Sequence, residues 1–188
     1  MPLPAPEVER QPLHTRTVRV DAFSRADGLF DLEAELLDVK HYDFPLVNPR
    51  GGIKPAGEPV HHMRLRITID GDYLITAAQA QFETVPYGEN CAGINSAYGA
   101  LVGMNLLKNF RDTVKRRFAR TAGCTHMTEL SYVLPTVAVQ AMASRRRQQA
   151  VDENKRPFQI GGCFAQREDG PVVQEFYPKW YVKPSVSS

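Results

Sequence analysis

Five thiol and imidazole side chains are the residues of this sequence best suited to metal or acid–base chemistry. They are His61, His62, Cys91, Cys124 and His126. Thiolate and imidazole are common ligands of zinc and iron, and an imidazole also exchanges protons near neutral pH. Each of the five stands at the end of an expected helix or strand, so short connections can bring them to one edge of a sheet. We predict metal ligands at His61, Cys91 and Cys124, and general bases at His62 and His126.

The spacing of these residues leaves a purely structural role open. No Cys-x-x-Cys pair occurs, and Cys91 and Cys124 are far apart in the chain. Free cysteines often pack as small buried hydrophobic residues, and the histidines could serve as surface or capping groups.

Three further side chains could take part in proton transfer. Glu33 belongs to a row of carboxylates with Asp31 and Glu35, which forms either a solvated sheet face or the wall of a site. Tyr87 and Lys40 are candidates to donate a proton or to stabilise an anion. Core packing is the alternative for Tyr87, and a surface ion pair is the alternative for Lys40.

Alternating polar and apolar residues predict the strands that would position these groups. The alternation covers residues 14–23, 29–39, 63–69 and 73–84. Asp70-Gly-Asp72 predicts a turn that joins the last two strands into a hairpin. Arg25 and Asp27 flank the turn between the first two strands and are expected to pair.

Apolar residues at spacings of three and four predict helices after Pro86. One stripe runs from Ile94 to Phe118, and a second helix is expected to open at Cys124 and to bend at Pro135. Residues 157–181 have the pattern of a terminal hairpin. Strands followed by helices indicate an α+β domain, an antiparallel sheet with helices on one side. We expect a single domain over residues 1–188, with an extended arm at 1–12 and a core at 57–142.

The composition narrows the classes of function. A net charge of +2 and 43% hydrophobic residues are ordinary for a globular protein. Basic residues cluster in 108–120 and 145–147 without interleaved aromatics, so we expect no nucleic-acid partner. No apolar run is long enough to span a membrane, no signal sequence is visible, and the cysteine count is odd, which together favour a soluble, cytoplasmic protein.

Several motifs carry a resemblance to a bacterial family of uncharacterised domains associated with the catabolism of aromatic compounds. They are RADGLFDLE at 25–33, LDVK at 37–40, GEPVH at 57–61, MRLRIT at 63–68, GCTH at 123–126 and YPKWY at 177–181. His62 stands where the family tends to have Asp. The resemblance implies a small aromatic substrate.

Residues 57–142 also resemble, in the order of their elements, the iron–sulfur scaffold proteins of the IscU/NifU type. Those proteins run from a strand hairpin through a cysteine and a helix to a late cysteine that opens a helix. The resemblance implies an IscU/NifU-like core in which His61 or His62, Cys91 and Cys124 converge, with zinc or iron as the metal.

We therefore expect a lyase that acts on lignin-type aromatics without an organic cofactor, by retro-aldol loss of formaldehyde from a hydroxymethyl group. The alternative is a metal- or sulfur-carrying scaffold protein without catalytic activity. The N-terminal arm and the aromatic tail favour a homo-oligomer, because extended termini need a surface to pack against.

Overall fold

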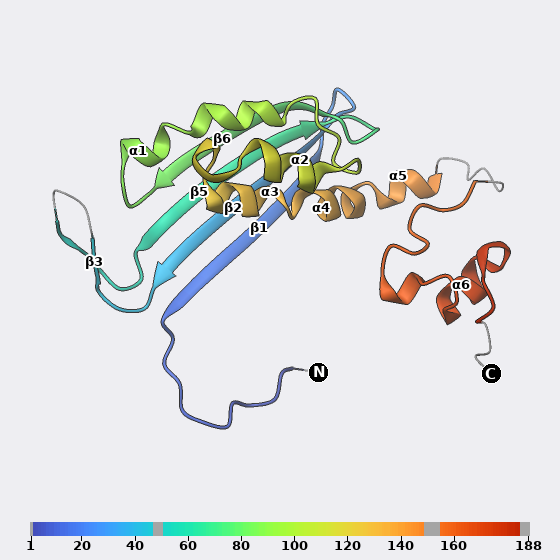
Figure 1. Cartoon of the computed structure of the whole chain (residues 1–188), viewed down its shortest axis with the longest axis horizontal. Helices are drawn as coiled ribbons and strands as arrows, with labels where there is room; N and C mark the ends of the chain where they lie inside the picture. The colour runs from blue at the N-terminus through green and yellow to red at the C-terminus, as the bar shows by residue number, and fades with distance from the viewer. Residues whose placement is uncertain (1, 47–50, 149–154, 185–188) are drawn as a thin grey trace. The chain divides into compact units, whose positions relative to one another are not determined.

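A computed structural model describes residues 2–46, 51–148 and 155–184 of the chain. The chain divides into two compact units, Met1–Ala143 and Ser144–Ser188, which are described separately. The first unit holds the sheet and most of the helices (Figure 1). The expectation of one domain over the whole chain stays a prediction.

The first unit is built on a four-stranded antiparallel sheet with the strand order β1-β2-β5-β6. Its strands are β1 (His14–Ser24), β2 (Phe30–Lys40), β5 (Pro59–Ile69) and β6 (Ile75–Thr84). The predicted hairpin is confirmed, and so is its continuation through the strand at residues 29–39. A small second sheet pairs β3 (Phe44–Pro45) with β4 (Ile53–Lys54).

The alternation in β2 assigns its residues to the two faces of the sheet. Leu32, Ala34 and Leu36 are buried, whereas Glu33 and Glu35 are only half-buried on the opposite side. Successive side chains in a strand point to opposite faces, so this row fixes which face carries the core. We call the face that contains Leu32 and Leu36 the inner face and the opposite one the outer face.

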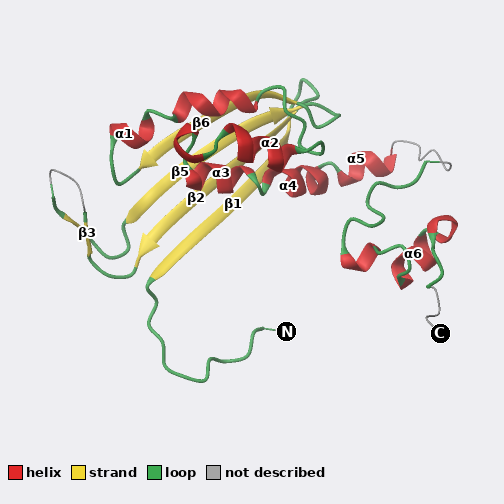
Figure 2. Ribbon diagram, viewed as in Figure 1, coloured by secondary structure: helices red, strands yellow, loops and turns green. Residues whose placement is uncertain are grey.

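Helices cover the inner face (Figure 2). The 3-10 helix η1 (Asn95–Leu101) contacts β6, α3 (Thr125–Ser131) contacts β2 and β5, and α4 (Leu134–Ala141) contacts β1 and β2. The α+β class is thus confirmed, with an antiparallel sheet and helices on one side. The remaining helices of this unit are α1 (Glu89–Ala92), α2 (Phe110–Arg117) and η2 (Arg120–Ala122).

Apolar side chains from the sheet and the helices form one core. It includes Leu65 and Ile67 of β5, Tyr98 and Leu101 of η1, and Leu130, each at most 1% exposed. Burial of one such side chain contributes about 1.5–3 kcal/mol, so this core holds the helices against the sheet.

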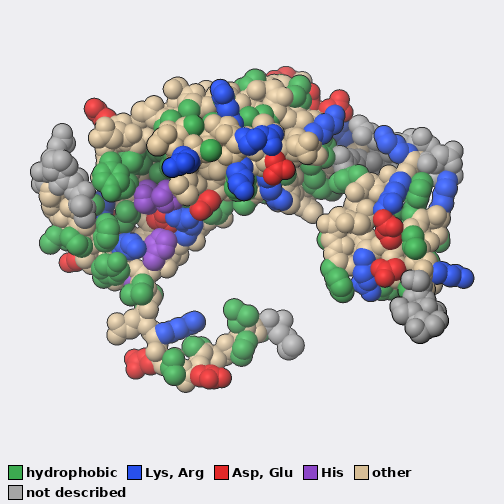
Figure 3. All heavy atoms as spheres, in the orientation of Figure 1, with side chains coloured by type: hydrophobic (Ala, Val, Ile, Leu, Met, Phe, Trp, Pro, Cys, Tyr) green, Lys and Arg blue, Asp and Glu red, His purple; other side chains and the backbone are tan. Residues whose placement is uncertain are grey.

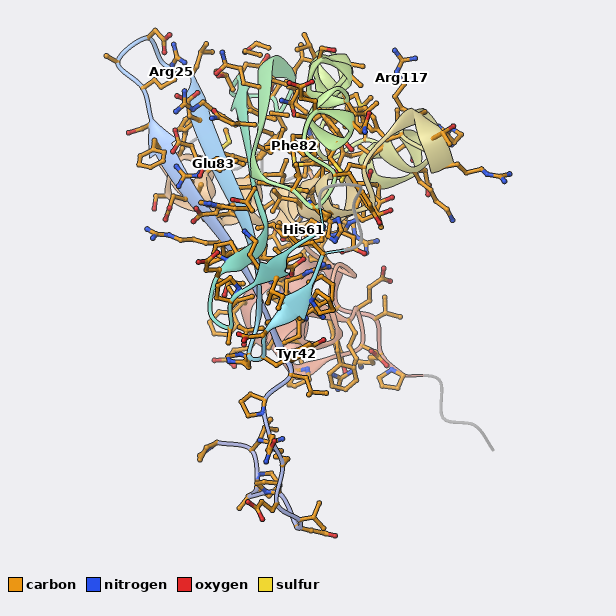
Figure 4. The ribbon with its side chains drawn as sticks, turned by 90° about the vertical axis from the view of Figure 1, so that its left-hand side faces the viewer. Arg25, Tyr42, His61, Phe82, Glu83 and Arg117 are labelled. Atoms are coloured by element: carbon orange, nitrogen blue, oxygen red, sulfur yellow. The ribbon has the colours of Figure 1, made fainter. Side chains whose placement is uncertain are left out.

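Local sequence explains how the helical region is divided. The predicted stripe from Ile94 is interrupted at Gly103, whose φ of 85° suits glycine, and α2 begins only at Phe110. The second helix was expected to bend at Pro135, but it is divided in two: α3 ends at Ser131, and Pro135 lies in the first turn of α4. Arg117 of α2 is exposed and labelled in Figure 4.

The second unit does not contain the hairpin predicted at residues 157–181. Its described residues form η3 (Phe164–Gln166), α6 (Pro171–Phe176) and η4 (Pro178–Trp180), after α5 (Ala143–Gln148) at the junction of the two units. Pro171 opens α6 and Pro178 opens η4, positions where a missing N–H is tolerated at a helix start. The alternation of polar and apolar residues that predicted the hairpin is short, and the two prolines favour helix starts instead. The hairpin prediction was therefore wrong.

Within the described residues, no helix has the length and apolar character needed to cross a membrane.

Candidate functional site

A buried carboxylate lies at the centre of the candidate site. Asp38 follows Leu32, Ala34 and Leu36 in the inner-face row of β2, and it is only 3% exposed. It is the one acidic residue among the described residues that is buried to this degree. Burial of a charge is costly unless partners compensate it, so its surroundings decide its role.

Arg16 of β1 is the first partner of Asp38. Its Nε donates to Oδ1 at 2.7 Å and its Nη2 donates to Oδ2 at 2.8 Å, a bidentate pair. Its remaining Nη1 donates to Oε2 of Glu129, on α3, at 2.7 Å. The guanidinium therefore bridges two carboxylates, one buried and one half-exposed.

Three imidazoles surround the same carboxylate. Nε2 of His14 lies 3.1 Å from Asp38 Oδ1, and Nδ1 of His61 lies 3.1 Å from Oδ2. Nε2 of His126, in α3, lies 3.6 Å from Oδ2, and its ring packs on that of His61 with the centroids 4.0 Å apart. The site thus joins β1, β2, β5 and α3.

The protonation states of the group follow from its burial and charges. Burial lowers the pKa of His61 and of His126 below the ordinary 6.5, so both imidazoles are neutral at neutral pH. Burial alone would raise the pKa of Asp38, but the hydrogen bonds and charge of Arg16 outweigh it, and the pKa lies below 3.8. Asp38 and Glu129 supply two carboxylates against the single guanidinium of Arg16.

Cys124 adjoins the site through His126. Its Sγ lies 3.9 Å from Nδ1 of that imidazole. The backbone of Cys124 is held in place by the buried Tyr98, whose hydroxyl accepts from the Cys124 N–H at 2.8 Å and donates to its carbonyl at 3.0 Å. Gly123, the residue before Cys124, packs closely against Phe118. A Cβ atom on Gly123 would lie 2.6 Å from the Phe118 Cβ. This packing fixes the start of α3 and therefore the position of His126.

Asp38, His61 and His126 have the composition of a metal site. One ligand atom from each lies within 4.8 Å of the other two, and the charge of the cluster favours a cation. Two imidazoles and a carboxylate bind zinc in hydrolases and iron(II) in oxygenases. The site therefore fits a divalent transition metal, and the residues by themselves do not select which one.

The imidazoles of the site reach the surface. The side chains of His14, His61 and His126 are 35%, 18% and 24% exposed. Figure 3 shows histidine side chains on the visible face, with hydrophobic side chains beside them. The imidazoles of the site are thus partly exposed to solvent, while its carboxylate is buried.

An aromatic pair lies close to the site in sequence. Lys40 follows Asp38 by two residues on β2, and its Nζ lies 5.9 Å from the ring centroid of Tyr42 and 5.6 Å from that of Phe44. The two rings meet edge to face with their centroids 6.4 Å apart. Lys40, one of the predicted catalytic residues, thus lies within cation–π distance of two aromatic side chains.

The structure brings together only part of the residue set predicted from the sequence. His61, His126 and Cys124 meet around or beside Asp38. The group that could hold a metal contains neither Cys91 nor Cys124, and Cys91 lies half-buried in α1. Tyr87 is 58% exposed in the turn that follows β6.

His62 and Glu33 lie on the outer face, opposite His61. Nε2 of His62 lies 2.6 Å from Oε1 of Glu35, and its Nδ1 lies 2.9 Å from Oε2 of Glu83. Glu33 pairs with Arg66 at 2.7 Å. His61 and Glu83 are both labelled in Figure 4. Adjacent residues of a strand point to opposite faces, which separates His62 from the site that His61 joins.

Four residues of the site were not among those predicted from the sequence: Asp38, Arg16, His14 and Glu129. A usable signal existed for Asp38, because it continues the apolar row of β2 and so places a carboxylate on the core face. No comparable pattern marked Arg16 or His14, since they join the site only through the pairing of β1 with β2. Glu129 joins through the placement of α3.

The fold and site define an α+β protein in which an antiparallel sheet and α3 together form an Asp–His–His group with a buried carboxylate and two partly exposed imidazoles. Comparison with protein families gives a match over residues 14–140 to the family described as a protein of unknown function (DUF2889). The match covers more than half of the chain, so the chain belongs to this family. The matched range runs from His14, the first residue of β1, into α4 and contains every residue of the site.

Comparisons with curated proteins and with solved structures found no match. Membership of an uncharacterised family is thus confirmed. The association with aromatic catabolism and the resemblance to the iron–sulfur scaffold proteins stay predictions.

Proposed function

We propose that the protein is a metal-dependent lyase that acts on small aromatic molecules, with Asp38, His61 and His126 as the metal ligands. The observation that carries the proposal is the group itself, a buried carboxylate and two neutral imidazoles with their ligand atoms within 4.8 Å. Neutral imidazole and ionised carboxylate are the forms that bind metal, so the site needs no change of protonation to accept zinc or iron(II).

A metal held by Asp38, His61 and His126 would compete with Arg16 for the Asp38 carboxylate, to which the guanidinium donates two hydrogen bonds. The contact of Arg16 with Glu129 supplies an anionic partner that remains when this contact is lost. The arrangement thus allows Asp38 to keep a compensating cation in both states.

His14 is the residue we assign as general base. It is not one of the three ligands, and its ring is oriented by Nε2 against Asp38 Oδ1, which leaves Nδ1 for a substrate. Its side chain is among the more exposed of the site, which gives a substrate access. Lys40 with the rings of Tyr42 and Phe44 would contact the aromatic part.

The reaction we propose is the retro-aldol loss of formaldehyde from a hydroxymethyl side chain. The base takes the hydroxyl proton, the O–H electron pair becomes the second bond of the formaldehyde C=O, and the C–C bond breaks. Its electron pair stays with the aromatic fragment, which takes up one proton, so no oxidant is required. A bound metal would stabilise negative charge on the substrate oxygen. The resemblance to aromatic-catabolism proteins supports the choice of substrate class.

Metal analysis joined to a product assay tests the proposal. Purified protein incubated with zinc or iron(II) and then desalted is expected to retain about one metal ion per chain. Asp38→Asn should lose it, and Glu33→Gln, an isosteric change on the outer face, should keep it. Loaded protein should release formaldehyde from hydroxymethyl-bearing aromatic compounds. Equal metal content in wild type and Asp38→Asn would contradict the proposed centre.

The position of Cys124 beside His126 favours a second candidate, a metal or sulfur carrier without catalytic activity. This function would use the same group but pass the metal to a partner, with the thiol assisting the transfer. Metal-loaded protein that transfers its ion to an acceptor protein and releases no formaldehyde would favour the carrier.

A further inference from the structure

The strand β1 forms a free edge of the sheet (Figure 2). It pairs with β2 along its whole length without a bulge. Two backbone bonds just outside the strand fix its orientation, from the His41 N–H to the Leu13 carbonyl and from the Arg25 N–H to the Leu29 carbonyl. Because hydrogen-bonded pairs alternate along antiparallel strands, the odd residues of β1 direct their backbone groups toward β2.

The even residues of β1 therefore direct their N–H and C=O groups away from the sheet. They run from His14 to Ser24, and the backbone bonds of the described residues outside the strands include none from these groups. A straight edge of this length is a template for pairing with another strand. Val18 and Phe23 are also 44% and 49% exposed along it. Neither proline nor a bulge protects this edge.

We propose that this edge pairs with β1 of a second copy, antiparallel and about a two-fold axis at Val20, to give one continuous eight-stranded sheet. In this register Arg19 of each copy lies opposite Asp21 of the other. Shifting the axis by one residue would instead place Arg19 opposite Arg19 or Asp21 opposite Asp21. Only the register centred on Val20 sets opposite charges directly across the interface.

The geometry of the edge suits these ion pairs. Arg19 and Asp21 direct their backbone groups toward β2, so across the new interface they form a non-hydrogen-bonded pair, the closer type, with Cα atoms about 4.5 Å apart. The side chain of Arg19 is 68% exposed and that of Asp21 is 43% exposed, and they contact each other within one chain at 2.9 Å. Exchange of this pair between the copies keeps each charge compensated. On the inner face the same register places Val18 opposite Ala22.

The inference does not depend on the proposed metal centre, because Arg19, Asp21 and Ala22 lie outside it. It gives the expected homo-oligomer a definite interface. His14 and Arg16, at the N-terminal end of β1, belong to the site, so dimer formation would stabilise the strand that supplies them.

Charge reversal provides the test, with molar mass measured by light scattering over a dilution series of the full chain. Wild type is expected to be a dimer. Arg19→Asp and Asp21→Arg each place like charges across the axis and should raise the dissociation constant about tenfold or more. The double variant recreates the opposite-charge pairs with their positions exchanged and should restore the dimer.

A backbone variant tests the pairing independently of charge. Ala22→Pro removes an N–H that faces the free edge and no bond to β2, and should give a folded monomer. Ala22→Val keeps the N–H and should remain dimeric. Circular dichroism checks that each variant is folded. A monomeric wild type, a dimeric Ala22→Pro, or a double variant that stays as dissociated as the single reversals would overturn the proposal.

Discussion

Arg16 and Asp38 form a bidentate ion pair between neighbouring strands, with N–O distances of 2.7 and 2.8 Å. They are direct partners in the register of β1 with β2, so the sheet itself holds them together. The same carboxylate is the point where His14, His61 and His126 meet. The guanidinium of Arg16 thus pairs with the same carboxylate that, together with His61 and His126, would bind a metal ion.

Replacement of Arg16 should have two separately measurable effects, a lower stability of the metal-free protein and a higher affinity for zinc. In Arg16→Met the buried Asp38 loses its strongest partner, and we expect the free energy of unfolding of the metal-free protein to fall by about 1–3 kcal/mol. Removal of the competing cation should also tighten zinc binding about tenfold. Chemical denaturation and calorimetric titration measure the two effects.

The matched control for this change is Arg66→Met. Arg66 pairs with Glu33 on the outer face with half of its side chain exposed, so its loss should change stability little and zinc affinity not at all. Weaker zinc binding in Arg16→Met than in wild type would show that Arg16 supports the ion and does not compete with it.

Substitution of three histidines should distinguish the general base, a metal ligand and a residue outside the site. His14→Ala is expected to keep the metal and lower turnover ~10²–10⁴-fold, the usual contribution of general acid–base catalysis. His126→Ala should lose the metal and turnover together. His62→Ala should keep both, because that residue lies on the outer face. Metal content and formaldehyde release are measured on the same samples. A large loss of turnover in His62→Ala alone would show that the general base lies on the outer face.

Much of the fold could be predicted because alternation along a strand records which side of the sheet is buried. The rows in residues 29–39 and 63–69 show this directly, and their strands pair as expected. The site was harder to predict, because its members come from paired strands and from α3. Which strands pair, and in which register, cannot be deduced from the spacing of residues along the sequence. Residue type and a position at the end of an expected helix pointed to Cys91, whereas the third member of the metal group is a carboxylate in an apolar row.

The pH dependence of stability should reveal the role of His62 on the outer face. The hydrogen bond from His62, together with Arg64, holds the pKa of Glu35 below its ordinary 4.5. A carboxylate with a lowered folded-state pKa stabilises the fold above the pKa of the unfolded chain. That contribution is lost as the pH falls from 4.5 through the folded-state value. In His62→Ala the pKa of Glu35 should rise toward 4.5, and stability should fall less steeply with acid in this window.

Carbon-detected NMR of the Glu35 carboxyl, in wild type and His62→Ala, measures this shift. Thr84→Ala is a suitable control, because Thr84 lies opposite His62 on β6 and carries no charge. An unchanged titration of Glu35 in His62→Ala would show that Arg64 alone sets its pKa.

Gly123 should be required for the position of His126, although it makes no contact with a metal. Its φ of −158° is extended backbone, so an alanine there is not strained by conformation. The obstacle is space, because the new Cβ would lie 2.6 Å from Phe118 Cβ and 2.8 Å from the Phe118 carbonyl oxygen. Gly123→Ala must therefore move the start of α3, and we expect a loss of about 1–3 kcal/mol in stability with weaker zinc binding.

Gly99→Ala is the matched control, since a Cβ at Gly99 meets no atom within 4 Å. Unfolding curves and zinc titrations of both variants decide the matter. Wild-type zinc affinity in a destabilised Gly123→Ala would show that α3 can shift without displacing the imidazole, and that the Phe118 contact serves the core alone.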